Sequence, residues 1–200
     1  MFFKKLLVLV IAFLFLFSPK NQFNNVLAAD PGSYVMNMTK NAIDTLTNQS
    51  ISDQEKEDEF GKLFDKNFDV PSISRFVLGK YWKQASLDQK KKFIKAFRNY
   101  VVKTYSNRFS EYSGEQLKLI NFKNESNPKI FLVHTGLERQ DAPLIKVDWR
   151  IGKKKDRFVI LDIIIEGISL AVTQRSEFVS VIDQNEGNID KLISLLKEKS

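Results

Sequence analysis

Side chains that could perform catalysis or bind a metal are scarce in this chain of 200 residues. His134 is the only histidine and cysteine is absent, so neither a multi-histidine nor a cysteine-ligated zinc site can form. The segment Gly167-Ile168-Ser169-Leu170-Ala171 lacks the second glycine of a nucleophile elbow. The eight glycines are not gathered into a phosphate-binding loop. We therefore expect no metal and no cofactor.

Two residues keep a catalytic interpretation open. His134 alternates with Leu132 and Gly136 in a predicted strand, which favours a surface or sheet-edge histidine over a catalytic base or pH sensor. Asp162 is flanked by leucine and isoleucine, and a carboxylate in apolar surroundings can gain a raised pKa and act as a base. The more ordinary interpretation is that Asp162 faces solvent or pairs with Arg150 across strands. We expect no enzyme; the alternative is a cone-shaped enzyme that acts on an apolar small molecule.

Helical patterns precede residue 117. Ser52-x-x-Glu55 and Ser86-x-x-Gln89 have the spacing of capping boxes, in which two side chains satisfy free amides at a helix start. A short helix is predicted after Pro71. The helix that follows Ser86 is predicted to run to about Tyr112, with a wide apolar stripe formed by Phe93, Ile94, Phe97, Tyr100, Val101, Tyr105 and Phe109.

Strand patterns follow the helices. Apolar and β-branched runs separated by turn residues predict four strands, at residues 117–123, 129–137, 144–151 and 157–165. The short connections between them predict antiparallel hairpins. The predicted fold class is therefore α+β: a helical N-terminal half packed on a curved four-stranded antiparallel sheet, with C-terminal helices.

Gly167 separates the last predicted strand from a helical region. Its backbone can adopt angles closed to other residues, which suits a chain that reverses over its own sheet. The apolar positions that follow fall mostly on one helical face: Leu170, Val172, Phe178, Val181 and Ile182. This pattern is typical of a helix that packs against a core.

Residues 1–28 have the organisation of a secretory signal peptide. Lys4-Lys5 is a basic start, residues 6–17 are apolar, and Val26-Leu27-Ala28-Ala29 is a small-residue cleavage site. The apolar run is shorter than the ~20 residues of a membrane-spanning helix. We therefore expect cleavage of the leader, and a single exported domain at 29–200 that is soluble in the periplasm.

The charge of the mature chain is modest. Removing the three lysines of the leader, and no acid, lowers the formal net charge from +7 to +4. Nucleic-acid binding would require a concentrated basic stripe with exposed aromatic residues, so we expect no nucleic-acid partner.

Four segments, taken in order, resemble one protein family. They are residues 68–82, with Asp69, Gly79 and Trp82 at the family's spacing, the predicted helix at 93–109, Glu-Gly-Ile-Ser-Leu and Thr-Gln-Arg-Ser-Glu-Phe within 166–178, and residues 187–193. Together they cover nearly the whole chain after its leader. The set is similar to MlaC-type proteins, the periplasmic phospholipid-binding component of a lipid-transporting ABC system, also called the toluene-tolerance auxiliary family.

The resemblance implies a cone-shaped fold like that of nuclear transport factor 2, with an apolar cavity for acyl chains. Under this interpretation the long helix faces the sheet, and the cavity is lined by Phe97, Val101, Tyr105, Val133, Val147, Trp149, Ile163 and Ile165. The pattern of apolar residues alone equally predicts an ordinary filled core, as in a closed-core scaffold protein.

The resemblance also implies a function and partners. The protein would carry glycerophospholipid between an outer-membrane lipoprotein–porin complex and an inner-membrane ABC transporter with an MCE-domain subunit. A carrier of this kind is physically required, because burial of each CH₂ contributes roughly 0.8 kcal/mol and a 16-carbon tail exposed to water costs about 12 kcal/mol.

Cleavage of the leader is the first testable prediction. Exported protein should begin at or next to Ala29, because a Val26-x-Ala28 site follows an apolar run that is too short to span a membrane. N-terminal sequencing and intact mass measure this directly. Exported material that begins at Met1 or Phe2 would contradict it.

Overall fold

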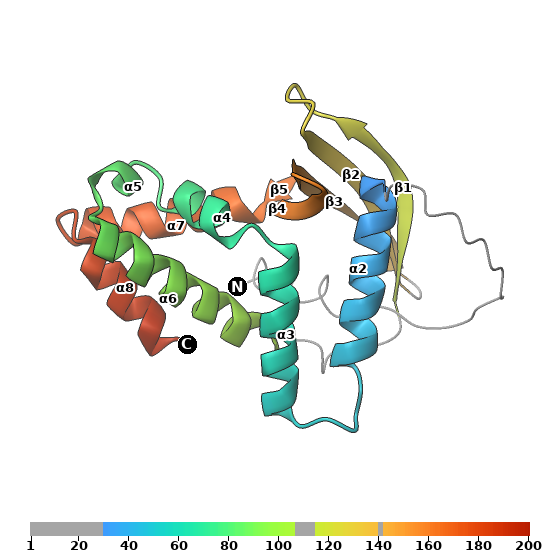
Figure 1. The fold of residues 1–200 in the computed structure, drawn as a ribbon, viewed down its shortest axis with the longest axis horizontal. Coiled ribbons are helices and arrows are strands. Elements are labelled where there is room, and N and C mark those ends of the chain that lie inside the picture. The colour runs from blue at the N-terminus through green and yellow to red at the C-terminus, as the bar shows by residue number, and fades with distance from the viewer. Residues whose placement is uncertain (1–29, 107–114, 140–141) are drawn as a thin grey trace.

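The structure, a computed structural model, describes residues 30–106, 115–139 and 142–200 (Figure 1). The helices in these ranges are α2 (Pro31–Leu46), α3 (Asp53–Asn67), α4 (Val70–Val77), α5 (Tyr81–Gln84), α6 (Leu87–Ser106), α7 (Leu170–Gln184) and α8 (Ile189–Glu198). The strands are β1 (Gln116–Asn124), β2 (Ile130–Arg139), β3 (Ala142–Lys154), β4 (Arg157–Ile165) and β5 (Ile168–Ser169). The expected leader and the predicted part of the long helix beyond Ser106 lie outside the described residues.

The strands form one antiparallel sheet in the order β1-β2-β3-β4-β5. The predicted α+β class is confirmed, and the four predicted strands correspond to β1–β4. The sheet also has a fifth strand of two residues, which pairs with the end of β4 through Ile165 and Ile168. Gly167 makes this reversal possible with a φ of 80°, as its position predicted.

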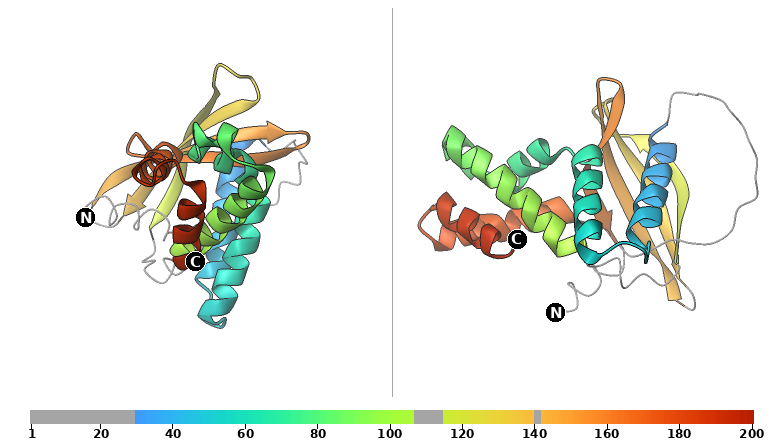
Figure 2. Two further views of the ribbon diagram at one scale, coloured as in Figure 1. Left: turned by 90° about the vertical axis from the view of Figure 1, so that its left-hand side faces the viewer. Right: turned by 60° about the horizontal axis from the view of Figure 1, so that its bottom comes forward.

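Helix α2 lies on the sheet, next to β1 and β2 (Figures 1 and 2). It begins at Asp30, whose side chain accepts a hydrogen bond of 2.9 Å from the amide of Ser33, and Pro31 occupies the first turn. Val35 and Ile43 are buried on one face of the helix. This helix was not predicted from the sequence.

The helices α4 to α8 form a second layer beside the sheet (Figure 2). The predicted capping boxes are present: Ser52 and Glu55 cap the start of α3, and the amide of Gln89 donates to Ser86 Oγ at 3.1 Å at the start of α6. The apolar stripe of α6 packs against α7 and α8. Phe178 of α7 is in edge-to-face contact with two rings of that stripe.

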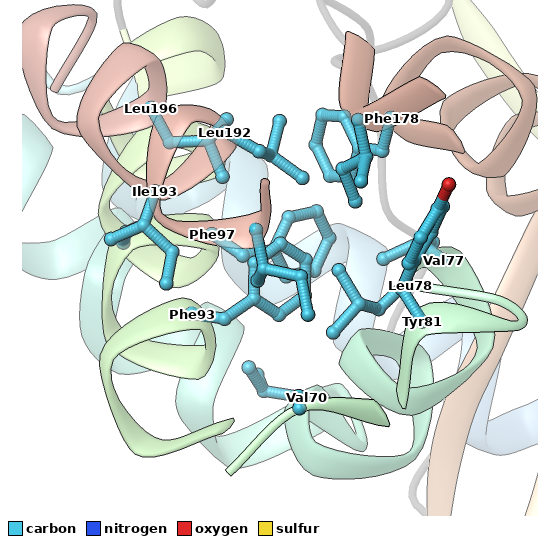
Figure 3. Close-up of a cluster of buried hydrophobic side chains, with 14 of the residues drawn as sticks. Val70, Val77, Leu78, Tyr81, Phe93, Phe97, Phe178, Leu192, Ile193 and Leu196 are labelled. Atoms are coloured by element: carbon cyan, nitrogen blue, oxygen red, sulfur yellow. The ribbon is translucent and has the colours of Figure 1, made fainter. Parts of the chain in front are cut away.

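The apolar core is divided into two clusters. The helical cluster comprises Phe64, Val70, Val77, Leu78, Tyr81, Ala85, Phe93, Ala96, Phe97, Val102, Phe178, Ile182, Ile189, Leu192, Ile193 and Leu196 (Figure 3). The sheet cluster comprises Val35, Leu117, Val133, Leu137, Ile145, Val147, Trp149, Ile151, Ile160 and Ile165. Among the described residues, Phe68 packs against both clusters.

Because the core is divided, the contribution of the helical cluster to stability can be measured separately. Phe93 is fully buried there, with ring centroids 6.0 Å from Phe97 and 5.9 Å from Phe178. Replacing Phe93 by Ala should lower the free energy of unfolding by about 3–5 kcal/mol. Leu87→Ala, at a side chain that is 78% exposed, is the control and should change it by less than about 0.5 kcal/mol. Equal effects in urea denaturation would contradict this packing.

Candidate functional site

Five of the eight residues predicted to bind lipid lie together in or against the sheet cluster. Val133, Val147 and Trp149 are buried on the sheet face that α2 covers, and the hydrogen-bonded register places Val133 opposite Trp149. Trp149 in turn pairs with the half-buried Ile163, and Val147 pairs with Ile165. They come together because antiparallel hairpins set neighbouring strands in register, so alternate residues of β2, β3 and β4 share one face.

The polar atoms within this cluster are satisfied by each other. The hydroxyl of Thr135 donates to the carbonyl of Val147 at 2.6 Å and accepts from Trp149 Nε1 at 3.1 Å. Because both polar side chains bond within the sheet, the surface directed toward α2 is apolar. An apolar face suits hydrocarbon and offers few directed contacts to a polar ligand.

The three predicted residues on α6 lie elsewhere. Phe97 belongs to the helical cluster, Val101 packs against that cluster and Tyr105 is half-buried near the end of the helix. No strand residue belongs to the helical cluster in the described part of the chain. This differs from the expected arrangement, in which the α6 stripe faces the sheet. The reason is that α7 and α8 supply the apolar partners of α6, while α2 packs on the sheet.

A group of aromatic and polar side chains borders the sheet cluster. The hydroxyl of Tyr34 donates to the backbone and side-chain oxygens of Asn67 at 3.2 Å, which links α2 to the end of α3. Its ring lies 5.7 Å from that of Phe158, which contacts Phe131 edge-to-face. Burial raises the pKa of Tyr34 to about 12, despite the opposing charge of Arg157, so its hydroxyl stays neutral and remains a donor.

Asp162 is a structural residue in this fold. Its carboxylate accepts hydrogen bonds from the Ser169 hydroxyl at 2.6 Å, the Ala171 amide at 3.0 Å and Arg150 Nη1 at 3.1 Å. The predicted pairing with Arg150 across strands is confirmed. Three donors bind a carboxylate that is 3% exposed, which leaves it poorly placed to accept a proton from a substrate.

His134 lies on the sheet face opposite α2. Its Nδ1 is 2.8 Å from Asp148 Oδ1, its register partner on β3, and both side chains are about one quarter exposed. In the described ranges, no group of three or more His, Cys, Asp or Glu residues could hold a metal ion. The pair is a cross-strand contact of the kind that stabilises a sheet.

Asp69 is a second buried carboxylate; it was identified from the sequence only as part of the segment that resembles the family, and its burial was not predicted. It caps α4 by accepting from the Ser72 amide at 3.4 Å, and it lies 2.6 Å from Lys154 Nζ of β3. Its own amide donates to the carbonyl of Ile160 at 3.0 Å. Burial alone would raise the pKa of Asp69, but the hydrogen bonds from Lys154 and Ser72 outweigh it and lower the pKa below the usual value.

None of the helices that the structure describes is both long and apolar enough to cross a membrane. The sheet order and the sheet cluster define an α+β protein whose candidate site is an apolar sheet face covered by a helix. The sequence profile of the MlaC protein family matches residues 36–198, and the chain belongs to this family.

Two proteins of known name are similar to this chain, one in sequence and one in fold. It is 24% identical over 127 residues to the intermembrane phospholipid transport system binding protein MlaC of Haemophilus influenzae (strain ATCC 51907 / DSM 11121 / KW20 / Rd). The match spans 62% of this chain and 58% of that protein. The fold resembles the phospholipid-binding protein from Ralstonia solanacearum, solved in complex with a phospholipid, with a TM-score of 0.73 and 19% identity over 86% of this chain and 97% of that one.

The lowered pKa of Asp69 predicts how stability depends on pH. A carboxylate whose pKa is lower in the folded state stabilises the fold above its unfolded pKa of about 3.8, and this contribution is lost as pH falls through the lower folded value. Asp69→Asn should therefore reduce the free energy of unfolding at pH 7 by about 1.5–3 kcal/mol. The difference from wild type should shrink below pH 3.8.

Urea unfolding between pH 7 and pH 2.5 measures this difference. Asp88→Asn removes an exposed ion pair with Lys92 inside α6 and should cost less than about 0.5 kcal/mol. A difference for Asp69→Asn that stays constant across this range would contradict the assignment.

Proposed function

We propose that this protein is a periplasmic phospholipid carrier. The observation that carries the proposal is the apolar sheet face beneath α2, where the polar side chains bond to each other. Membership of the MlaC family supports it, as do the named functions of the Haemophilus and Ralstonia relatives. Carriage requires no chemical step, so we propose that the protein is not an enzyme.

The acyl chains of the lipid would contact the sheet cluster. We propose that Val133, Val147, Trp149, Ile163 and Ile165 form the lipid-contacting surface. Phe97, Val101 and Tyr105 would contribute only where a chain reaches toward the helical cluster. Leu119 and Phe122 of β1 extend the same sheet face toward its edge, and they are 40% and 42% exposed. An exposed apolar edge of this kind offers a route by which hydrocarbon enters without crossing polar groups.

The remaining features of the proposal follow from the family. Residues 1–28 would direct export, and residues 29–200 would act as a single lipid-binding domain. The protein would exchange glycerophospholipid with an outer-membrane lipoprotein–porin complex and with an inner-membrane ABC transporter that has an MCE-domain subunit. An apolar site with few directed polar contacts would accept varied head groups.

Two half-buried residues form a matched pair of tests. Ile163 packs against the sheet cluster and Val101 against the helical cluster. Ile163→Glu should remove co-purified phospholipid while the protein remains folded, because a desolvated carboxylate among acyl chains costs several kcal/mol. Val101→Glu should retain lipid, with only a loss of stability.

Mass spectrometry of an organic extract of purified protein measures the lipid, and circular dichroism monitors the fold. Val147→Glu, at a fully buried position, provides a second change in the sheet cluster. Lipid lost from Val101→Glu and retained by folded Ile163→Glu would move the site to the helical cluster. Wild-type protein purified from the periplasm without any two-tailed lipid would contradict the carrier function.

A further inference from the structure

Three large apolar side chains are exposed where α4, β5 and α7 meet. Phe76 is 40% exposed, Ile168 is 38% exposed and Val172 is 51% exposed. Helices α4 and α7 pack side by side (Figure 1), and the guanidinium carbon of Arg175 lies 5.2 Å from the centroid of the Phe76 ring. Arg175 follows Val172 by three residues, so both lie on the same side of α7. Arg75, the exposed residue that precedes Phe76 on α4, adds a second cation, and we call these residues together the α4–α7 patch.

Arg175 is held in place by its surroundings. Its planar guanidinium lies over the Phe76 ring, and a Cβ built at Gly79 would lie 3.0 Å from Arg175 Nε. Gly79 therefore leaves the space that this side chain occupies, and its φ of 58° also favours glycine. A cation positioned in advance loses less conformational entropy when it binds an anion.

The patch carries uncompensated positive charge. Within the described ranges, neither Arg75 nor Arg175 forms an ion pair with a carboxylate. Glu166, two residues before Ile168, accepts a hydrogen bond from the amide of Lys146 on β3. Glu177 of α7 lies close enough to Tyr100 of α6 to influence it. The pKa of Tyr100 is raised, first by the burial of its own side chain and then by the negative charge of Glu177. The two arginines are therefore free to bind an external anion.

The position of the patch links it to both apolar clusters. Leu170 packs against the sheet cluster and Ala171 against the helical cluster, immediately before the exposed Val172. The patch thus lies where the chain passes from the proposed lipid-contacting sheet to the helices. The two sequence segments that meet here, 68–82 and 166–178, are two of the four segments that together carry the family resemblance.

We propose that the α4–α7 patch docks on the surface of a phospholipid membrane that contains anionic lipid. The inference rests on the proposed carrier function, because a carrier must approach the lipids it exchanges. Phe76, Ile168 and Val172 enter the boundary between head groups and acyl chains, where exposed apolar side chains are stabilised. Arg75 and Arg175 bind lipid phosphates, for which the guanidinium fork is well suited.

A fluorophore at position 172 tests this contact. The chain has no cysteine, so Val172→Cys provides a single site for an environment-sensitive dye. Leu87→Cys is a matched control, at an exposed apolar residue at the start of α6. With vesicles of phosphatidylethanolamine and phosphatidylglycerol at 3:1, the emission at position 172 should shift to the blue. The control should not shift, and pure phosphatidylcholine vesicles should affect neither.

Removing the two charges tests the electrostatic part. Arg75→Gln/Arg175→Gln should lower partition onto the anionic vesicles by roughly thirtyfold at low salt. Lys91→Gln/Lys95→Gln removes two exposed positive charges from α6 and should leave partition almost unchanged. Circular dichroism shows that each variant is folded. Co-purified lipid, measured by mass spectrometry, reports the carrier function independently of vesicle binding.

Three outcomes would overturn the docking proposal. Wild-type protein that carries lipid but binds neither vesicle refutes membrane docking and leaves the carrier function intact. Binding that the α6 variant weakens as much as the arginine variant shows nonspecific attraction. If the arginine variant loses binding to an isolated protein partner and wild-type protein does not bind vesicles, the patch is a protein interface instead.

Discussion

The arrangement of the molecule depends on the need to compensate two buried carboxylates. A carboxylate removed from water destabilises the fold unless donors and a cation replace its hydration. Asp69 and Asp162 each bind a backbone amide at a helix start, in α4 and α7, and each binds a basic side chain of β3. Apart from Phe68, no described residue packs against both apolar clusters. These polar links therefore help to hold the directions in which the two helices leave the sheet, together with the packing of α4 on α7 and of α7 on β4.

The division of the apolar core into two clusters suits a protein in which a ligand enters and leaves one of them. In a single continuous core, a ligand that enters between side chains disturbs packing throughout, because interiors are close-packed. Here the helical cluster has its own ring contacts around Phe178, while the sheet cluster is bounded by α2. Acyl chains could thus displace α2 or its side chains while Asp69 and Asp162 keep the helices in place. Under this view, the polar links separate lipid loading from global stability.

The sheet could be predicted closely from the sequence, and so could the residues that share its face. Alternation has a period of two, and short turns permit only antiparallel neighbours, so Val133, Val147 and Trp149 were expected to lie together. The partner of α6 could not be predicted in the same way. An apolar stripe shows that a helix face is buried, but it does not identify the opposing element. Helix α2 was missed, although Asp30 followed by Pro31 and apolar residues at helical spacing signals a helix start.

Val172 is an apolar residue that was expected to be buried and is exposed. It was grouped with Phe178 and Ile182 as part of one apolar face, and those two residues are buried while Val172 is not. Phe178 lies six positions after Val172, which at 3.6 residues per turn places the two side chains about 120° apart around the helix. Solvent exposure of a single valine needs no explanation. Its position one helical turn before Arg175, whose guanidinium lies over the exposed Phe76 ring, is different. Apolar surface and a cation without a carboxylate partner together favour binding to an amphipathic anionic surface.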